Sequence, residues 1–174
     1  MNIAPEWKRI AGIHMDKEGL IGAVWLAYDP SLDRVYVYDA CLFRNEVPVI
    51  ITEGLNARGR WIPIAWPEKA KDLSKELLER GCNMLHDPIK DSDSLTEINS
   101  RQIEERLRTK RLSAEKRLAE WLDEYKSFFR SESKVPSDGH PLMSATRHAV
   151  SELKYAKRQS VQRKTLNYPR LSIR

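Results

Sequence analysis

Three apolar segments joined by short turns fill most of the first 43 residues. Residues 8–15 are mostly apolar, residues 20–28 ("LIGAVWLAY") form an almost continuous apolar run, and residues 34–43 alternate apolar and polar side chains. An alternating pattern indicates a half-buried strand, and a short continuous run with β-branched and aromatic members is typical of a strand buried on both faces. Because parallel strands need a long crossover, the short turns predict an antiparallel meander.

Helical periodicity replaces this pattern after residue 44. Asn45 and Ser113 are expected to cap two of the helices, and Leu77 and Leu78 are expected to lie in the buried stripe of another. Seven further elements are predicted, in this order: a helix over 45–59, a strand over 60–66, a helix over 67–81, a strand over 82–87, and helices over 95–109, 112–130 and 142–158.

This order of elements predicts an α/β fold, with a mixed five-stranded sheet flanked by helices. The strands linked through the helix over 67–81 should be parallel, because such crossovers are right-handed and return in the same direction. The order is that of the ribonuclease H-like fold, in which carboxylates from the first strand, the fourth strand and the last helix meet at one edge. Two divalent metals held there clamp the attacking and leaving oxygens of a phosphodiester.

Length and composition are those of one globular domain rather than a disordered chain. The chain has 174 residues, of which 41% are hydrophobic and 32% charged. A domain over residues 1–158 and a basic tail over 159–174 are expected. No apolar stretch suits a membrane span or a signal peptide, so no membrane partner is expected. Two cysteines are too few for a disulfide scaffold and favour a reducing compartment.

Positive charge is concentrated in two stretches of the chain. The formal net charge is +5, and after Glu152 the sequence contains no acidic residue. One-sign segments attract polyanions, of which nucleic acid is the first candidate, although a solubilising end, an assembly arm or a solvated helix face would have the same composition. The candidate DNA-binding residues are Arg106, Arg108, Lys110, Arg111, Lys157, Arg158, Arg163 and Lys164.

Two other groupings have simpler structural interpretations. Cys82 and His86 have a spacing that can bind zinc, but nothing nearby completes four ligands, which favours a buried thiol beside a surface histidine. An aromatic stripe along the helix over 112–130 is expected to belong to the core rather than to stack on bases. Its members are Trp121, Tyr125, Phe128 and Phe129.

Several stretches over residues 5–158 resemble the C-terminal nuclease domain of phage terminase large subunits, of the type found in P22-like short-tailed phages and prophages. They are "PEWKRIAGI", "AVWLAYDP", "VYVYDA", "WIPIAWP", "GCNML" and "LMSATRHAV". The resemblance implies a ribonuclease H-like domain that cuts concatemeric viral DNA during packaging, with Mg²⁺ or Mn²⁺ as cofactor, in the cytoplasm of the bacterial host. Double-stranded DNA, the terminase ATPase or small subunit, and the portal are the partners that it implies.

The resemblance also reveals departures at the positions where the family carries its metal-binding acids. His14 falls at the first acid position, Lys69 falls at the acid position after the fourth strand, and Pro141 falls where an acid precedes the last helix. An ammonium group repels a dication, and imidazole is a poorer ligand than oxygen for magnesium. These departures favour a degraded site, with no cofactor.

Four nearby carboxylates keep the opposite interpretation open. Asp16, Glu18, Glu68 and Asp138 could have taken over the catalytic role from shifted positions, with Asp16, Glu68 and Asp138 binding the metal. No G-x-x-x-x-G-K-[ST] loop occurs, so the chain alone is not expected to be a motor. The loss of acids favours a stand-alone gene over a separately produced domain.

Three functions therefore stay open at this point. The first is a DNA-binding, packaging-related domain with weak or lost hydrolysis. The second is an active metal-dependent endonuclease, and the third is a protein-interaction module that regulates or interferes with a terminase. Metal binding separates the first two functions, and DNA affinity separates both from the third.

Overall fold

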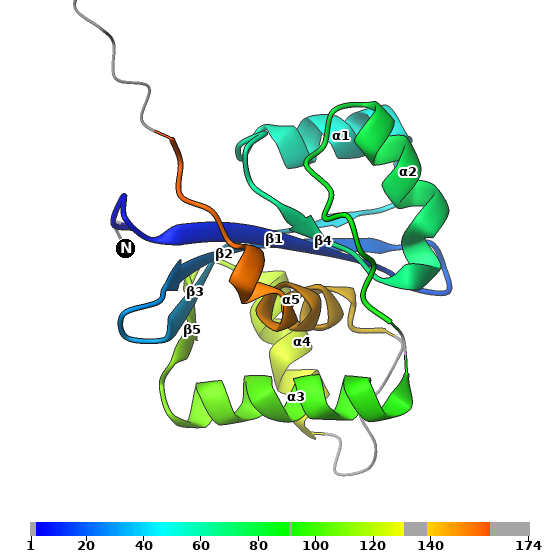
Figure 1. Ribbon diagram of the computed structural model, residues 1–174. Coiled ribbons are helices and arrows are strands. Elements are labelled where there is room, and N and C mark those ends of the chain that lie inside the picture. Colours follow the sequence, from blue (N-terminus) through cyan, green and yellow to red (C-terminus); the bar gives the residue numbers. More distant parts are fainter. Residues whose placement is uncertain (1–2, 91, 131–138, 161–174) are drawn as a thin grey trace, which may run out of the picture.

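A five-stranded mixed sheet forms the centre of the molecule (Figure 1). The computed structural model describes residues 3–90, 92–130 and 139–160. Its strands are β1 (Lys8–Met15), β2 (Ile21–Asp29), β3 (Arg34–Phe43), β4 (Ile64–Ala65) and β5 (Leu112–Ala114), in the spatial order β4-β1-β2-β3-β5. The first three strands are antiparallel neighbours, while β4 pairs with β1 and β5 pairs with β3 in parallel. The predicted meander is confirmed.

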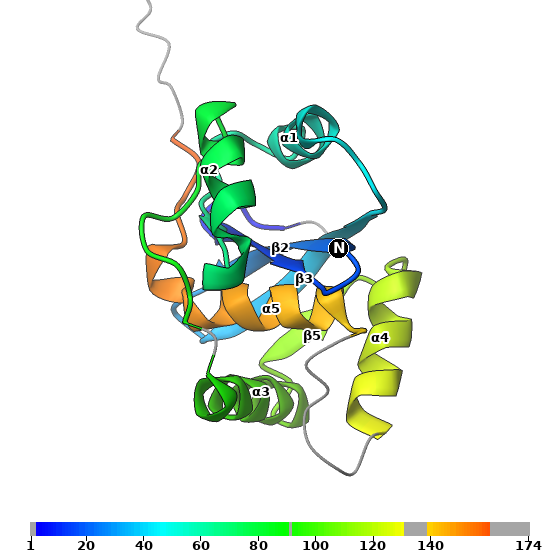
Figure 2. The ribbon, with the colours of Figure 1, turned by 90° about the vertical axis from the view of Figure 1, so that its right-hand side faces the viewer.

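Helices cover both faces of this sheet (Figures 1 and 2). Helices α1 (Pro48–Asn56) and α2 (Lys71–Glu79) lie on one face, and α3 (Asp93–Arg108), α4 (Ala119–Arg130) and α5 (Pro141–Ser151) lie on the other. Short 3₁₀ turns, η1 (Glu68–Ala70) and η2 (Leu153–Tyr155), precede α2 and follow α5. Each face has its own hydrophobic cluster. This architecture confirms the ribonuclease H-like fold class. In the described residues, no helix is long and apolar enough to cross a membrane.

The fifth strand comes from a different segment than the sequence predicted. Residues 82–87 contribute only an isolated parallel bridge between Ile64 and Met84, whereas Leu112–Ala114 forms β5. Ser113 therefore lies in a strand and does not cap α4, which begins at Ala119. The backbone of Lys110 has a positive φ of 56°, which ends α3 and turns the chain back to β3. Pairing with that distant strand overrides the local helical pattern.

Two further boundaries and one buried position differ from the prediction. Asn45 has φ of 54°, and α1 begins only at Pro48, after Val47 as N-cap. Proline suits the first helical position because its fixed φ and missing N–H cost nothing there. Leu78 is 57% exposed instead of buried. The last predicted helix ends at Ser151, seven residues before the expected end at 158.

Helix α5 lies unusually close to the sheet, because two glycines face it. A Cβ atom at Gly22 would lie 2.6 Å from the carbonyl oxygen of Pro141, and one at Gly12 would overlap the carbonyl oxygen of Ala145. All residues from Pro141 to Val150 are buried. Hydrogen atoms at these two strand positions therefore permit the contact that fixes α5 over β1 and β2.

Candidate functional site

A buried pair of histidines lies where the end of β1 meets α5. Side chains alternate along a strand, so His14 is on the same face of β1 as Gly12, which faces α5. Nδ1 of His14 lies 3.0 Å from Nε2 of His148, and the two rings stack with centroids 5.2 Å apart. Both residues are buried, with 2% and 1% of their surface exposed. The pair fills the junction between the sheet and its closest helix.

His148 is held in its neutral form. Burial lowers the pKa of His148 well below its usual value, and His14, Arg147 and Lys69 lower it further by charge repulsion. Within the described residues, Nδ1 of His148 has no hydrogen-bond partner. A buried N–H without an acceptor costs about 1–3 kcal/mol. This cost is larger than that of an unprotonated ring nitrogen, a weak acceptor, without a donor. The favoured tautomer of His148 therefore donates from Nε2 to Nδ1 of His14.

A third nitrogen side chain approaches this pair from the segment after β4. Lys69 lies in η1, next to Glu68, and it is near enough to His148 to influence its protonation. The Lys69 and Glu68 side chains are exposed, and the Glu68 backbone N–H donates to the carbonyl of Ile89. The three segments that the sequence predicted to meet do meet. The histidines and Lys69 bring nitrogen bases, not carboxylates, to that junction.

The predicted catalytic carboxylates are dispersed among different surroundings. Oδ1 of Asp16 accepts hydrogen bonds from the N–H groups of Glu18, at 3.0 Å, and Leu20, at 2.8 Å, so this carboxylate stabilises the turn between β1 and β2. Glu18 is exposed. Asp138 lies outside the described residues. In the part of the chain that the structure describes, no three His, Cys, Asp or Glu side chains are arranged to hold a metal ion.

One carboxylate near the site was missed by the sequence analysis. Oε2 of Glu124, on α4, accepts hydrogen bonds from the N–H groups of Leu142, at 2.8 Å, and Met143, at 3.0 Å. These groups belong to the first turn of α5, where the helix dipole favours negative charge. Burial raises the pKa of Glu124 to about 7, with Glu120 and Asp16 adding repulsion. Its sequence position gives no signal, because only the packing of α4 on α5 creates the contact.

The residues around the start of α5 serve its local structure. Pro141 occupies the first turn of the helix, a position at which proline is favoured. His140 stands at the N-cap, and its ring meets the ring of Phe128 edge-on, with centroids 5.7 Å apart. In this stretch Pro141 and His140 therefore begin and brace a helix.

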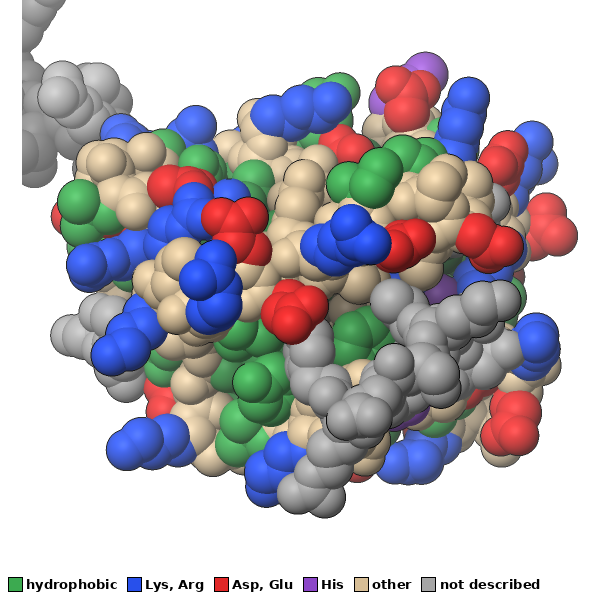
Figure 3. Space-filling model, turned by 90° about the horizontal axis from the view of Figure 1, so that it is seen from below, with side chains coloured by type: hydrophobic (Ala, Val, Ile, Leu, Met, Phe, Trp, Pro, Cys, Tyr) green, Lys and Arg blue, Asp and Glu red, His purple; other side chains and the backbone are tan. Residues whose placement is uncertain are grey.

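The basic stretch at the end of α3 is bound to acidic groups of the same chain. Nη2 of Arg106 lies 2.9 Å from Oδ1 of Asp33, and Nη1 of Arg111 lies 2.6 Å from Oδ2 of the same carboxylate. Arg111 also pairs with Glu105 at 2.9 Å. Figure 3 shows basic and acidic side chains interspersed on this side of the molecule. Arg108 and Lys110 remain exposed.

The second basic stretch begins where the chain leaves α5. Lys157 pairs with Arg9 at the start of β1, with N–O distances of 2.7 and 3.0 Å for their two backbone hydrogen bonds. The guanidinium of Arg9 lies 5.6 Å from the ring centroid of Tyr38. Lys157 and Arg158 are exposed. Arg163 and Lys164, with the rest of the predicted tail from residue 161 onward, lie outside the described residues.

The two remaining groupings agree with their simpler interpretations. Cys82 is buried, whereas the His86 side chain is 98% exposed and pairs with Asp87. Trp121 and Phe128 lie in the core cluster with α5, and Trp121 Nε1 donates to Oγ1 of Thr146 at 2.9 Å. Tyr125 packs against that cluster, while the Phe129 side chain is outside the described set.

Solved structures with the same fold are nuclease domains of large terminases. The nuclease domain of the P22 large terminase has a TM-score of 0.81 and 16% sequence identity, covering 91% of this chain and 87% of that one. The large terminase nuclease domain of bacteriophage SPP1, with bound Mn, has a TM-score of 0.68 and 13% identity over 83% of this chain and 86% of the other.

A longer structure places this fold within a larger protein. The large terminase of the thermophilic bacteriophage D6E has a TM-score of 0.65 and 12% identity, over 88% of this chain but 41% of its own length. No protein-family model matches the chain, and no curated protein matches it significantly. The resemblance to terminase nuclease domains, including that of P22, therefore rests on the shared fold.

Proposed function

We propose that this chain, which has the fold of large-terminase nuclease domains, serves in phage DNA packaging as a DNA-binding domain with weak or lost hydrolysis. Packaging would place it in the cytoplasm of a bacterial host, in contact with double-stranded DNA. The observation that carries the loss of hydrolysis is the His14–His148 pair with Lys69 beside it. The fold supports the packaging role, and the composition of this junction supports the change in chemistry.

The chemistry of the junction opposes a pair of hard dications. Mg²⁺ and Mn²⁺ prefer carboxylate, carbonyl and water oxygens. Here the histidine rings bond to each other in a buried position, and a lysine ammonium stands near. A dication placed among these groups would meet a like charge in surroundings of low dielectric constant, where repulsion is strong. The residues described at this junction therefore do not fit the two-metal group.

A plasmid-nicking assay tests the proposed loss of hydrolysis. Wild-type protein, incubated with supercoiled plasmid and Mn²⁺ or Mg²⁺, is expected to leave the plasmid intact. The matched control is an Asp16→Asn, Glu68→Gln double variant, which removes two candidate metal ligands. Nicking by wild type that the double variant loses would overturn the proposal and establish an active site built from shifted carboxylates.

Metal binding gives a second measurement that does not require turnover. The melting temperature of the wild type should not change with Mn²⁺, because no divalent ion is bound preferentially by the folded state. A His14→Asp, Lys69→Asp variant returns acids to two positions at the junction, and its melting temperature should rise with Mn²⁺. A rise of the same size in wild type would contradict the proposal.

The active-endonuclease alternative is favoured by one observation. Asp16 is close enough to Glu124 to raise the pKa of that carboxyl, so two elements bring acids to the rim of the site. In that case the catalytic carboxylates would be Asp16, Glu18, Glu68 and Asp138. The metal ion, Mg²⁺ or Mn²⁺, would be bound by Asp16, Glu68 and Asp138.

The protein-interaction alternative is favoured by an apolar surface on α1. Val47, Val49 and Ile50 are 56%, 44% and 43% exposed. A contiguous exposed apolar patch of this kind can mark a protein interface. A terminase ATPase or small subunit, or a portal, would be the partner under this alternative, which requires a chain without DNA affinity.

A further inference from the structure

The segment that leaves α5 is fixed to the edge of the sheet. The two hydrogen bonds between Lys157 and Arg9 use only backbone atoms. Along the outer edge of β1, Arg9 faces Lys157, and Ala11 and Gly12 face β4. The exit segment and β4 therefore share one edge of β1 end to end. This attachment holds the side chains of Lys157 and Arg158 at a defined place while leaving them in solvent.

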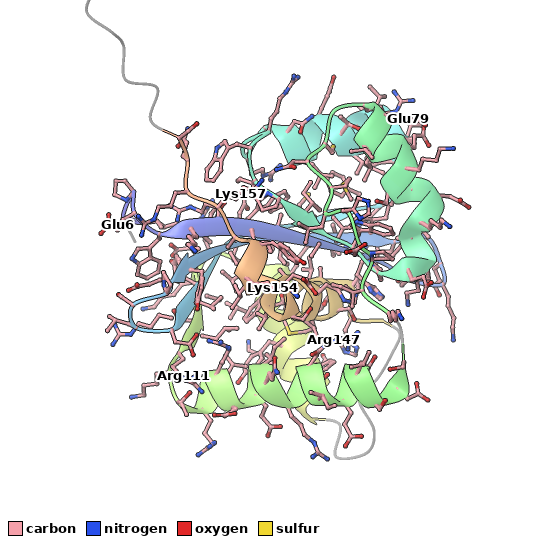
Figure 4. The ribbon with its side chains drawn as sticks, in the orientation of Figure 1. Glu6, Glu79, Arg111, Arg147, Lys154 and Lys157 are labelled. Atoms are coloured by element: carbon pink, nitrogen blue, oxygen red, sulfur yellow. The ribbon has the colours of Figure 1, made fainter. Side chains whose placement is uncertain are left out.

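Other basic side chains lie beside this attachment point (Figure 4). Lys154, in η2, is exposed, and its ammonium lies 4.9 Å from the ring centroid of Tyr155, which is 44% exposed. Arg158 follows Lys157 directly in the sequence and is also exposed. We define the exit surface as Lys154, Lys157 and Arg158.

The exit surface keeps most of its charge uncompensated. Lys157 and Arg158 make no ion pair with any described residue, and Lys154 has only a long contact of 3.9 Å with Glu152. Glu6 is another acid at this end of the molecule (Figure 4). The contrast is with Arg106 and Arg111, whose guanidiniums are already bound to Asp33. Unpaired cations can replace the counterions of a phosphate backbone without first breaking an internal ion pair.

We propose that the exit surface binds the phosphate backbone of double-stranded DNA and is the principal DNA contact of the described part of the chain. The choice of DNA as the polyanion rests on the proposed function. Arg9 precedes His14 by five residues on β1, which separates the exit surface from the histidine pair by about 17 Å. DNA held there does not depend on the chemistry of the His14 junction.

A pair of matched charge reversals tests this assignment in the full-length chain. Binding to a fluorescently labelled duplex is measured by anisotropy at several salt concentrations. Lys157→Glu with Arg158→Glu should weaken binding about tenfold or more near 0.1 M salt, because two phosphate contacts become repulsive. Arg108→Glu with Lys110→Glu changes the same charge at the other basic stretch and should weaken binding less than about threefold.

Neutral variants make the test quantitative. Lys157→Gln with Arg158→Gln should reduce the slope of log affinity against log salt by about two, since each lost phosphate contact removes nearly one released counterion. Both side chains are exposed and the backbone hydrogen bonds of Lys157 are retained, so the melting temperature should be unchanged. A chain ending at Ser160 should show the same loss on Lys157 and Arg158 substitution, which separates the exit surface from residues 161–174.

Three results would overturn the assignment. Equal affinities for wild type and the Lys157, Arg158 variants would exclude the exit surface. A larger loss in the Arg108, Lys110 variant would move the principal contact to the end of α3. A wild type without any DNA affinity would overturn both this assignment and the DNA-binding part of the proposed function. The nicking and Mn²⁺ measurements would still test independently whether the protein has lost hydrolysis.

Discussion

Helix α5, on one face of the sheet, packs more tightly than helices α1 and α2 on the other face, and we call these the tight layer and the loose layer. On one face, every residue of α5 from Pro141 to Val150 is buried, and the helix backbone rests on Gly12 and Gly22. On the other face, α1 leaves Val49 and Ile50 partly exposed, and α2 leaves Leu78 exposed. The tight layer carries His148 and contacts the strand that carries His14. Lys69, two residues before α2, also comes near that pair.

This difference explains how a stretch of this sequence can resemble terminase nuclease domains independently of the metal-binding acids. The stretch "LMSATRHAV" lies within α5, where nearly every side chain is fixed by close packing. Packing of this kind restricts residue size and shape at each position, because interiors have the density of organic crystals. Close packing does not restrict the charge of side chains at the edge of the candidate site. The resemblance in this stretch therefore reflects packing. Catalytic chemistry has to be judged separately, from His14, Lys69 and Pro141.

The largest expected effect comes from filling the space beneath α5. Gly12→Ala and Gly22→Ala should each lower the free energy of unfolding by about 3 kcal/mol or more, because the added methyl meets helix backbone that cannot give way locally. Gly54→Ala is the control in the loose layer. Its Cβ would meet side-chain atoms of Phe43 and Arg58 and no backbone, and alanine favours the helix. Equal losses in urea unfolding would show that the two layers do not differ.

Deleting leucine side chains sharpens the same comparison. Leu142→Ala should cost about 3 kcal/mol, because Leu142 is fully buried in α5 and its truncation leaves a cavity. Leu78→Ala, at a position that is 57% exposed on α2, should change stability by less than about 0.5 kcal/mol. Chemical denaturation of both variants measures the difference. A cost above about 1.5 kcal/mol at Leu78 would mean that a partner or second copy covers α2 in solution.

Acid should weaken the tight layer through His148. Its pKa is lowered in the folded state from the ordinary value of 6.5, so the unfolded chain binds the proton more readily. Stability is therefore complete above pH 6.5 and declines below it, by up to about 1.4 kcal/mol per pH unit for this one group. His148→Gln should flatten that decline in thermal melts between pH 4 and 7. His86→Gln, at an exposed site, should leave it unchanged, and an unchanged slope in His148→Gln would contradict the assignment.

Glu124 should produce a smaller effect of opposite sign. Its pKa is raised from 4.5 to about 7, so the folded state binds the proton more tightly than the unfolded chain. The stability that it contributes is complete below pH 4.5 and is lost as the pH rises toward 7. Because the side chain is partly open to solvent, the change should be on the order of 1 kcal/mol.

Glu124→Gln should remove that pH dependence while keeping an oxygen acceptor for the start of α5. The difference in melting temperature between variant and wild type should therefore grow in favour of the variant between pH 5 and 8. Glu79→Gln, at an exposed position on α2, serves as the control. A constant difference across this range would rule out a raised pKa at Glu124.

Local sequence patterns were sufficient for the elements whose structure depends on local periodicity. The three strands of the meander lie within one residue of their predicted bounds. Helices α2 and α4 fall inside predicted segments, and α3 begins two residues before its predicted start. The fold class followed from the order of these elements. Period-two and helical patterns record which side chains must be buried, and burial is the main driving force that the sequence displays directly.

Only the tertiary structure decided the features that depend on contacts between distant residues. Leu112–Ala114 forms a strand because it pairs with the open edge of β3. Residues 82–87 do not form a strand, because they meet β4 at a single bridge. The His14–His148 bond joins residues 134 positions apart. The contact of Glu124 with α5 and the ion pairs of Asp33 are equally non-local. The free energy of such contacts depends on geometry that the whole chain creates, and no local window of sequence contains it.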